Sequence, residues 1–131
     1  MSDTLVFVGS YSDAAQSGIH VYRLDSEKGA IEPISAIGGV KNPSFLAISP
    51  NKRNLYAVSE IGDFEGKPVG GVSGFSIDLE KGELQHINDQ PCGGSGPCHL
   101  SVDQTGRYIV VANYGGGSVS MLPINEDGSL G

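Results

Sequence analysis

Five residues with groups suited to proton transfer or ligand binding lie at the ends of apolar segments: Tyr11, Glu60, His99, Asn113 and Tyr114. A carboxylate such as Glu60 can act as a general base or bind a hydroxyl-rich ligand. The imidazole of His99 changes charge near neutral pH and is suited to proton transfer. Asn113 and the two tyrosines can contact a substrate through hydrogen bonds. We therefore take Glu60 and His99 as catalytic candidates and the other three as substrate-binding candidates.

These residues also have structural interpretations, and the sequence alone leaves both open. Glu60 stands where Tyr11 and Tyr114 stand in the other copies of a sequence repeat, and an acid there could be a solvated loop residue. His99 aligns with Phe45 in the same repeat, which favours a satisfied structural histidine over a catalytic one. The remaining candidates could cap strand ends and orient loops.

The repeat has a period of about 54 residues and dominates the chain. Segment 43–56 aligns without a gap on segment 97–110, an offset of 54 residues, and 18–29 aligns on 71–82, an offset of 53. A third copy of the second segment begins at Ser118. Periods of roughly 40–50 residues that carry several short strands are typical of β-propeller blades. A blade buries its faces only against neighbouring blades, so the repeat predicts an all-β propeller.

Alternation of apolar and polar residues between Gly, Asn and Pro turns predicts ten strands and no helix. The predicted strands are 4–11, 18–24, 31–37, 44–49, 54–60, 71–77, 83–88, 98–103, 107–114 and 117–124. They group into antiparallel blades of a four-stranded type near residues 1–40, 41–94 and 95–131, with three, four and three of the strands present, all within one propeller domain that spans 1–131. We expect about two and a half blades of an unclosed ring, whose open edges pair with the remaining blades or with a second copy.

Strand direction alternates within a blade, so the connections fall into two groups. We name the strands a to d from the central channel outward. The d–a and b–c connections then lie at one face of the ring, and the a–b and c–d turns lie at the other. All five candidate residues belong to the first face, at the mouth of the channel. A ligand site is expected there.

Composition and motifs exclude several classes of function. The chain has 131 residues and a net charge of −7, which argues against a nucleic-acid partner. No apolar run reaches the roughly 18 residues of a membrane span, and no signal segment precedes the first strand. Cys92 and Cys98 are expected as reduced thiols of a cytoplasmic protein. No metal site is expected, because neighbouring strand residues His99 and Cys98 point to opposite faces. The glycine run 115–117 predicts a tight hairpin, not a phosphate loop.

Four segments resemble the lactonase family of seven-bladed β-propellers, whose best-known members are cycloisomerase-type 6-phosphogluconolactonases. They are 42–50, 55–60, 96–103 and 106–119, and 112–118 is the most specific. The resemblance implies hydrolysis of a phosphorylated sugar lactone, 6-phosphogluconolactone, in the pentose phosphate pathway, without a cofactor or metal. It implies water attack on the ring carbonyl, aided by a general base and by groups that stabilise the oxyanion.

The resemblance places Glu60, His99, Asn113 and Tyr114 at family motif positions near the channel mouth. It also implies that most of the family's acid–base and arginine residues lie in central blades, beyond residue 131. Two other functions stay open because a fold does not decide a function. One is a non-catalytic propeller that binds a protein or a sugar acid. The other is a muconate-type lactone cyclase acting on a dicarboxylate.

Overall fold

The computed structural model describes residues 3–131, which form ten β-strands and no helix. The strands are β1 (Asp3–Val8), β2 (Ile19–Asp25), β3 (Ala30–Ile37), β4 (Leu46–Ile48), β5 (Asn54–Ser59), β6 (Gly71–Asp78), β7 (Glu83–Pro91), β8 (Pro97–Val102), β9 (Tyr108–Asn113) and β10 (Ser118–Pro123). Each corresponds to one strand predicted from the sequence. The largest differences are at β1, which ends three residues before position 11, at β4, which is shorter than 44–49, and at β7, which extends beyond 83–88.

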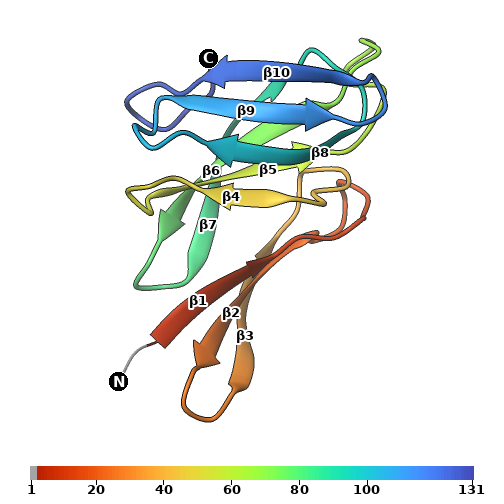
Figure 1. Ribbon diagram of the computed structural model, residues 1–131. Coiled ribbons are helices and arrows are strands. Elements are labelled where there is room, and N and C mark those ends of the chain that lie inside the picture. Colours follow the sequence, from red (N-terminus) through yellow and green to blue (C-terminus); the bar gives the residue numbers. More distant parts are fainter. Residues whose placement is uncertain (1–2) are drawn as a thin grey trace.

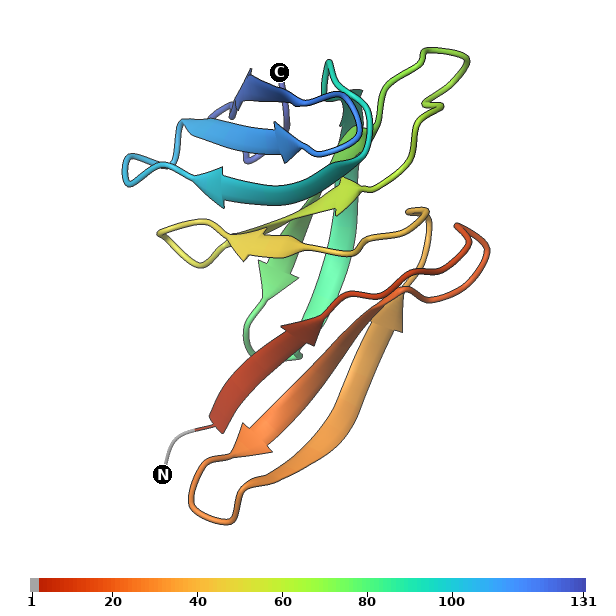
Figure 2. The same ribbon diagram turned by 45° about the vertical axis from the view of Figure 1, so that its right-hand side comes forward.

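The strands form three antiparallel sheets that follow one another along the chain. Their orders are β1-β2-β3, β4-β5-β6-β7 and β10-β9-β8, so each strand pairs with its neighbours in sequence. The sheets lie one above another, with the second between the first and the third (Figure 1). Turning the molecule shows that they fan out as blades, with β4 and β8 on adjacent inner edges (Figure 2). This architecture confirms the predicted all-β propeller fold.

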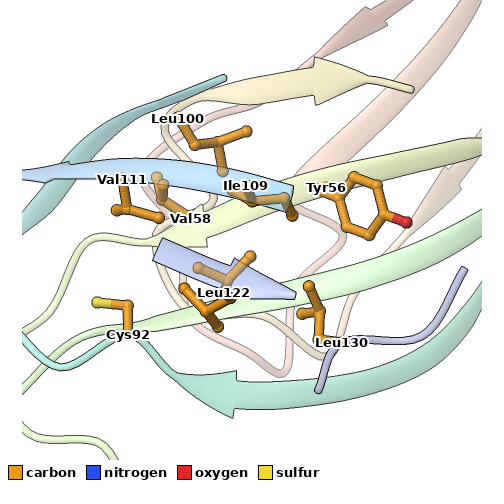
Figure 3. Close-up of a cluster of buried hydrophobic side chains, with 9 residues drawn as sticks. Tyr56, Val58, Cys92, Leu100, Ile109, Val111, Leu122 and Leu130 are labelled. Atoms are coloured by element: carbon orange, nitrogen blue, oxygen red, sulfur yellow. The ribbon is translucent and has the colours of Figure 1, made fainter. Parts of the chain in front are cut away.

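The second and third sheets enclose the larger apolar core. Figure 3 shows Tyr56 and Val58 of β5 beside Leu100 of β8 and Ile109 and Val111 of β9. The complete cluster consists of Tyr56, Val58, Val72, Cys92, Leu100, Ile109, Val111, Leu122 and Leu130. Removal of this surface from water is the main force that holds the two sheets together.

A second core lies between the first and second sheets. Its buried members are Ile19, Val40, Leu55, Ala57 and Phe75. β5 contributes to both cores because successive side chains of a strand point to opposite faces. All six residues of β5 are buried as a result. This explains why the segment 55–58 reads as a continuous apolar run.

The third sheet is covered on one face only. Along β9 the buried residues Ile109, Val111 and Asn113 alternate with exposed ones. The other face carries Val110, which is 42% exposed, together with exposed side chains of β10. Val110 lies 54 residues after Tyr56, which is fully buried against the third sheet. The exposed face is thus the repeat equivalent of a face that packs on a following sheet.

The repeat is also visible in the turns between strands c and d. Oδ1 of Asp25 accepts hydrogen bonds from the N–H groups of the second and third residues that follow it, and Oδ1 of Asp78 does the same. Each turn ends at a glycine with positive φ, 68° at Gly29 and 67° at Gly82. Aspartate and glycine stabilise such turns by local hydrogen bonding and by access to the left-handed region. The positive φ at both glycines confirms the glycine turns predicted from the sequence.

Candidate functional site at the channel-mouth face

Backbone hydrogen bonds tie the sheets together at the ends of β1 and β5. The N–H of Asn42 donates to the carbonyl oxygen of Ser12 at 2.8 Å, and its own carbonyl accepts from the N–H of Glu60 at 3.1 Å. Ser12 lies between β1 and β2, and Glu60 directly follows β5. Asn42 therefore brings the b–c connection of the first sheet against the end of strand b in the second.

Gly96 repeats this arrangement 54 residues later. Its N–H donates to the carbonyl oxygen of Ile61 at 3.0 Å, and its carbonyl accepts from the N–H of Tyr114 at 2.9 Å. Asn42 and Gly96 both have left-handed backbones, with φ of 51° and 62°. Glycine and asparagine adopt this conformation most readily. The ends of β1, β5 and β9 are consequently collected at one face, on the right in Figure 1.

Glu60 is held by residues from two sheets. Tyr11 Oη donates a hydrogen bond to Glu60 Oε1 at 2.9 Å, and Ser44 Oγ donates to the same oxygen at 2.5 Å. Tyr11 follows the end of β1, whereas Ser44 precedes β4. Within residues 3–131, Glu60 Oε2 has no hydrogen-bond partner. The carboxylate is thus fixed through one oxygen and presents the other as a free acceptor.

Tyr11 responds electrostatically to this contact although its side chain is 70% exposed. Its pKa is raised above that of an ordinary tyrosine, first because its hydroxyl donates to Glu60 and then because the charge of Glu60 opposes a phenolate. The structure therefore brings together two of the five candidates, one from each of two neighbouring sheets.

His99 contacts Phe45, the residue with which it aligns in the repeat. The two ring centroids lie 4.3 Å apart, and the ring planes are inclined by 36°. His99 belongs to β8, and Phe45 directly precedes β4. Both side chains are exposed, at 36% for Phe45. His99 thus lies on an aromatic neighbour at the inner edges of two sheets and is still accessible to a ligand.

The neighbouring residues Asn113 and Tyr114 differ in exposure, and neither has a hydrogen bond to Glu60 among the contacts described. Asn113 is 2% exposed, and its side-chain amide donates to Ser118 Oγ at 3.3 Å and to Ser120 Oγ at 2.9 Å. The Sγ–H of Cys92 donates to its oxygen at 3.4 Å. Tyr114 is 85% exposed. Asn113 therefore connects β9 to β10 in this structure, while the substrate-binding roles of both residues stay predictions.

Sequence reasoning did not select Ser44 and Phe45, although both contact candidate residues. A serine and a phenylalanine at the start of a strand carry no chemical signature of their own. The available signal was their alignment on Cys98 and His99, since equivalent positions of neighbouring blades lie side by side.

Three hollows lie near the opposite face, among the a–b and c–d turns. They are lined by turn residues such as Asn51, Lys81 and Thr105, and their linings do not include Glu60 or His99.

The described residues contain no group of three or more His, Cys, Asp and Glu side chains arranged to hold a metal ion. Both cysteines are free thiols. None of these residues forms a helix long and apolar enough to cross a bilayer.

Stacked antiparallel sheets of three, four and three strands, with polar groups gathered at one end, define a β-propeller with a candidate site at its channel mouth. Comparison with protein families identifies the family of propellers: the model of the seven-bladed β-propeller lactonases matches residues 5–131. The chain belongs to this family.

Named relatives agree with this assignment. The chain is 35% identical to a 6-phosphogluconolactonase of Bacillus subtilis over 130 residues, which cover 99% of the chain and 36% of that protein. It is 36% identical to a 6-phosphogluconolactonase of Formosa agariphila over 126 residues, 95% of the chain and 35% of that protein. The chain thus spans about a third of the length of these relatives.

Solved structures show the same fold. A Bacteroides uniformis protein provisionally named a 6-phosphogluconolactonase superposes with a TM-score of 0.89 at 33% identity, covering 100% of this chain and 36% of that one. A periplasmic gluconolactonase of Pseudomonas aeruginosa, PpgL, superposes with a TM-score of 0.84 at 36% identity, covering 98% and 36%.

Proposed function

We propose that the protein carrying this chain hydrolyses 6-phosphogluconolactone to 6-phosphogluconate, in the oxidative branch of the pentose phosphate pathway. The observation that supports this most strongly is the 35% identity to the Bacillus subtilis 6-phosphogluconolactonase along 99% of the chain. A lactone substrate also fits the polar groups at the channel-mouth face, which can accept hydrogen bonds from sugar hydroxyls.

The reaction adds water to the lactone carbonyl and then breaks the ring ester. A general base removes a proton from the attacking water, and hydrogen-bond donors or cations stabilise the oxyanion of the tetrahedral intermediate. Within this chain, Glu60 and His99 are the groups at the channel-mouth face able to accept that proton. Binding of the substrate's phosphate group would require cationic side chains. The Glu60 cluster instead consists of a carboxylate and the two hydroxyl groups that donate to it. We assign phosphate binding to blades that correspond to the remaining length of the relatives.

The test is an assay of lactone opening by the complete protein. 6-Phosphogluconolactone is generated from glucose 6-phosphate, and its disappearance is followed against the spontaneous rate. The expected result is hydrolysis well above that background. A folded protein with no activity would refute the proposal and favour a ligand- or protein-binding propeller, or a cyclase of the muconate type.

A second substrate separates two versions of the function. One solved neighbour is a gluconolactonase described as periplasmic, so the unphosphorylated lactone belongs in the same assay. Preference for 6-phosphogluconolactone supports the proposal, and preference for gluconolactone revises it. We place the protein in the cytoplasm, where that phosphorylated lactone is formed, and cell fractionation tests this location.

A further inference from the structure

The hydrogen bonds to Glu60 determine which part of its carboxylate faces a ligand. Tyr11 and Ser44 both donate to Oε1, at 2.9 Å and 2.5 Å, so rotation of the carboxylate would break both bonds. Oε2 has no partner within residues 3–131. An ionised carboxylate oxygen only accepts hydrogen bonds. The free oxygen therefore fits a donor, such as a hydroxyl group.

We propose that Glu60 recognises a ring hydroxyl of the sugar lactone through Oε2, with Tyr11 and Ser44 as positioning residues. This inference rests on the proposed function and assigns Glu60 to substrate recognition rather than to proton transfer. The partners of Glu60 are two hydroxyl groups that fix its orientation. This fixed orientation, with one oxygen occupied and the other an acceptor, is what recognition of a hydroxyl donor requires.

The decisive variant is Glu60→Gln, because the amide keeps one acceptor oxygen for Tyr11 and Ser44. It replaces the free Oε2 with an N–H donor of the same size. Loss of one hydrogen bond to a charged acceptor weakens binding by about tenfold or more. We expect KM for 6-phosphogluconolactone to rise about tenfold while kcat changes by less than about threefold. Glu80→Gln, on the opposite face, is the matched control and should leave both constants unchanged.

Singly deoxygenated substrates give a readout that a structural role would not affect. The lactone that lacks the recognised hydroxyl should be hydrolysed with the same KM by the wild-type and Glu60→Gln proteins. For lactones that retain this hydroxyl, the tenfold difference should persist. Tyr11→Phe should raise KM by a smaller factor, since one of the two bonds that orient the carboxylate is lost, and Tyr22→Phe should not.

The outcomes separate this inference from the proposed function. Hydrolysis by the wild type with an unchanged KM in Glu60→Gln would refute the inference and retain the function. Collapse of kcat with an unchanged KM would also refute it, because Glu60 would then be the general base. If the wild type binds 6-phosphogluconate in calorimetry but opens no lactone, loss of binding in Glu60→Gln would support the subsite and refute the function. Absence of both binding and hydrolysis would overturn both.

Discussion

Tyr56 and Gly128 are joined by a hydrogen bond that spans 72 residues of sequence. Tyr56 Oη donates to the carbonyl oxygen of Gly128 at 2.7 Å. Tyr56 lies in the centre of β5, and Gly128 lies in the turn that follows β10. Both are buried, so neither group can exchange its partner for water. The bond fixes that turn onto the middle sheet at the edge of the larger core.

Tyr56→Phe should destabilise the fold by roughly 1–3 kcal/mol, because the buried carbonyl of Gly128 loses its donor. Urea denaturation measures this difference. Tyr22→Phe is the comparison, and an equal effect in both variants would contradict the assigned role of the hydrogen bond.

Tyr56 should also set an alkaline limit to the stability of the fold. Burial raises the pKa of Tyr56 to about 12, with a smaller contribution from the charge of Asp127. Since the folded pKa exceeds the unfolded one, this stabilisation is complete below about pH 10 and is lost as the pH rises through about 12. Tyr56→Phe should flatten the fall in stability over that window.

Asp103 should produce an acid limit of stability. The hydroxyl of Thr105 donates to its carboxylate, as do the N–H groups of Arg107 and Tyr108, and these bonds lower its pKa to about 2 against the opposing effect of partial burial. A lowered folded pKa gives stability that is present above about pH 4 and is lost as the pH falls through about 2. Thermal melts of Asp103→Asn and wild type should therefore converge near pH 2. A constant difference across this range would contradict the prediction.

Asn113→Ala tests whether the buried amide has a structural role or a substrate-binding role. Removing it leaves the hydroxyls of Ser118 and Ser120 and the thiol of Cys92 without this partner. We expect a loss of about 2 kcal/mol in stability, as for other buried hydrogen-bonded groups. KM in the complete protein should change little. A stable variant with a raised KM would instead support the substrate contact predicted from sequence.

The 131-residue chain studied alone should self-associate through the uncovered face of its third sheet. Val119 is 73% exposed and Met121 is 64% exposed on β10, beside Val110 on β9. Exposed apolar patches of this kind on a sheet favour association. Light scattering should show a mass that increases with concentration. Val119→Thr with Met121→Lys should reduce it, and a monomer at all concentrations would contradict the prediction.

Much of the fold was predictable because it depends on local chemistry that the repeat displays twice. The alignment of 43–56 on 97–110 located strands and turns in both copies. The alternation of β9 and the turn glycines at positions 29 and 82 follow directly from residue type. The candidate site was predictable only as a face, because strand direction places all five candidates at one end of the sheets.

The sequence by itself determined the ten strands, the propeller architecture and the end of the sheets at which polar groups gather, since these depend on periodicity and on strand direction. The tertiary structure decided which of those groups meet. Tyr11 and Glu60 are 49 residues apart, and only the packing of two sheets brings a phenol within hydrogen-bond distance of a carboxylate. Packing likewise buries Asn113 and leaves Tyr114 exposed, although they are neighbours in sequence. The physical reason is that adjacent strand-end residues share a backbone but not an environment, because each side chain points toward a different neighbour.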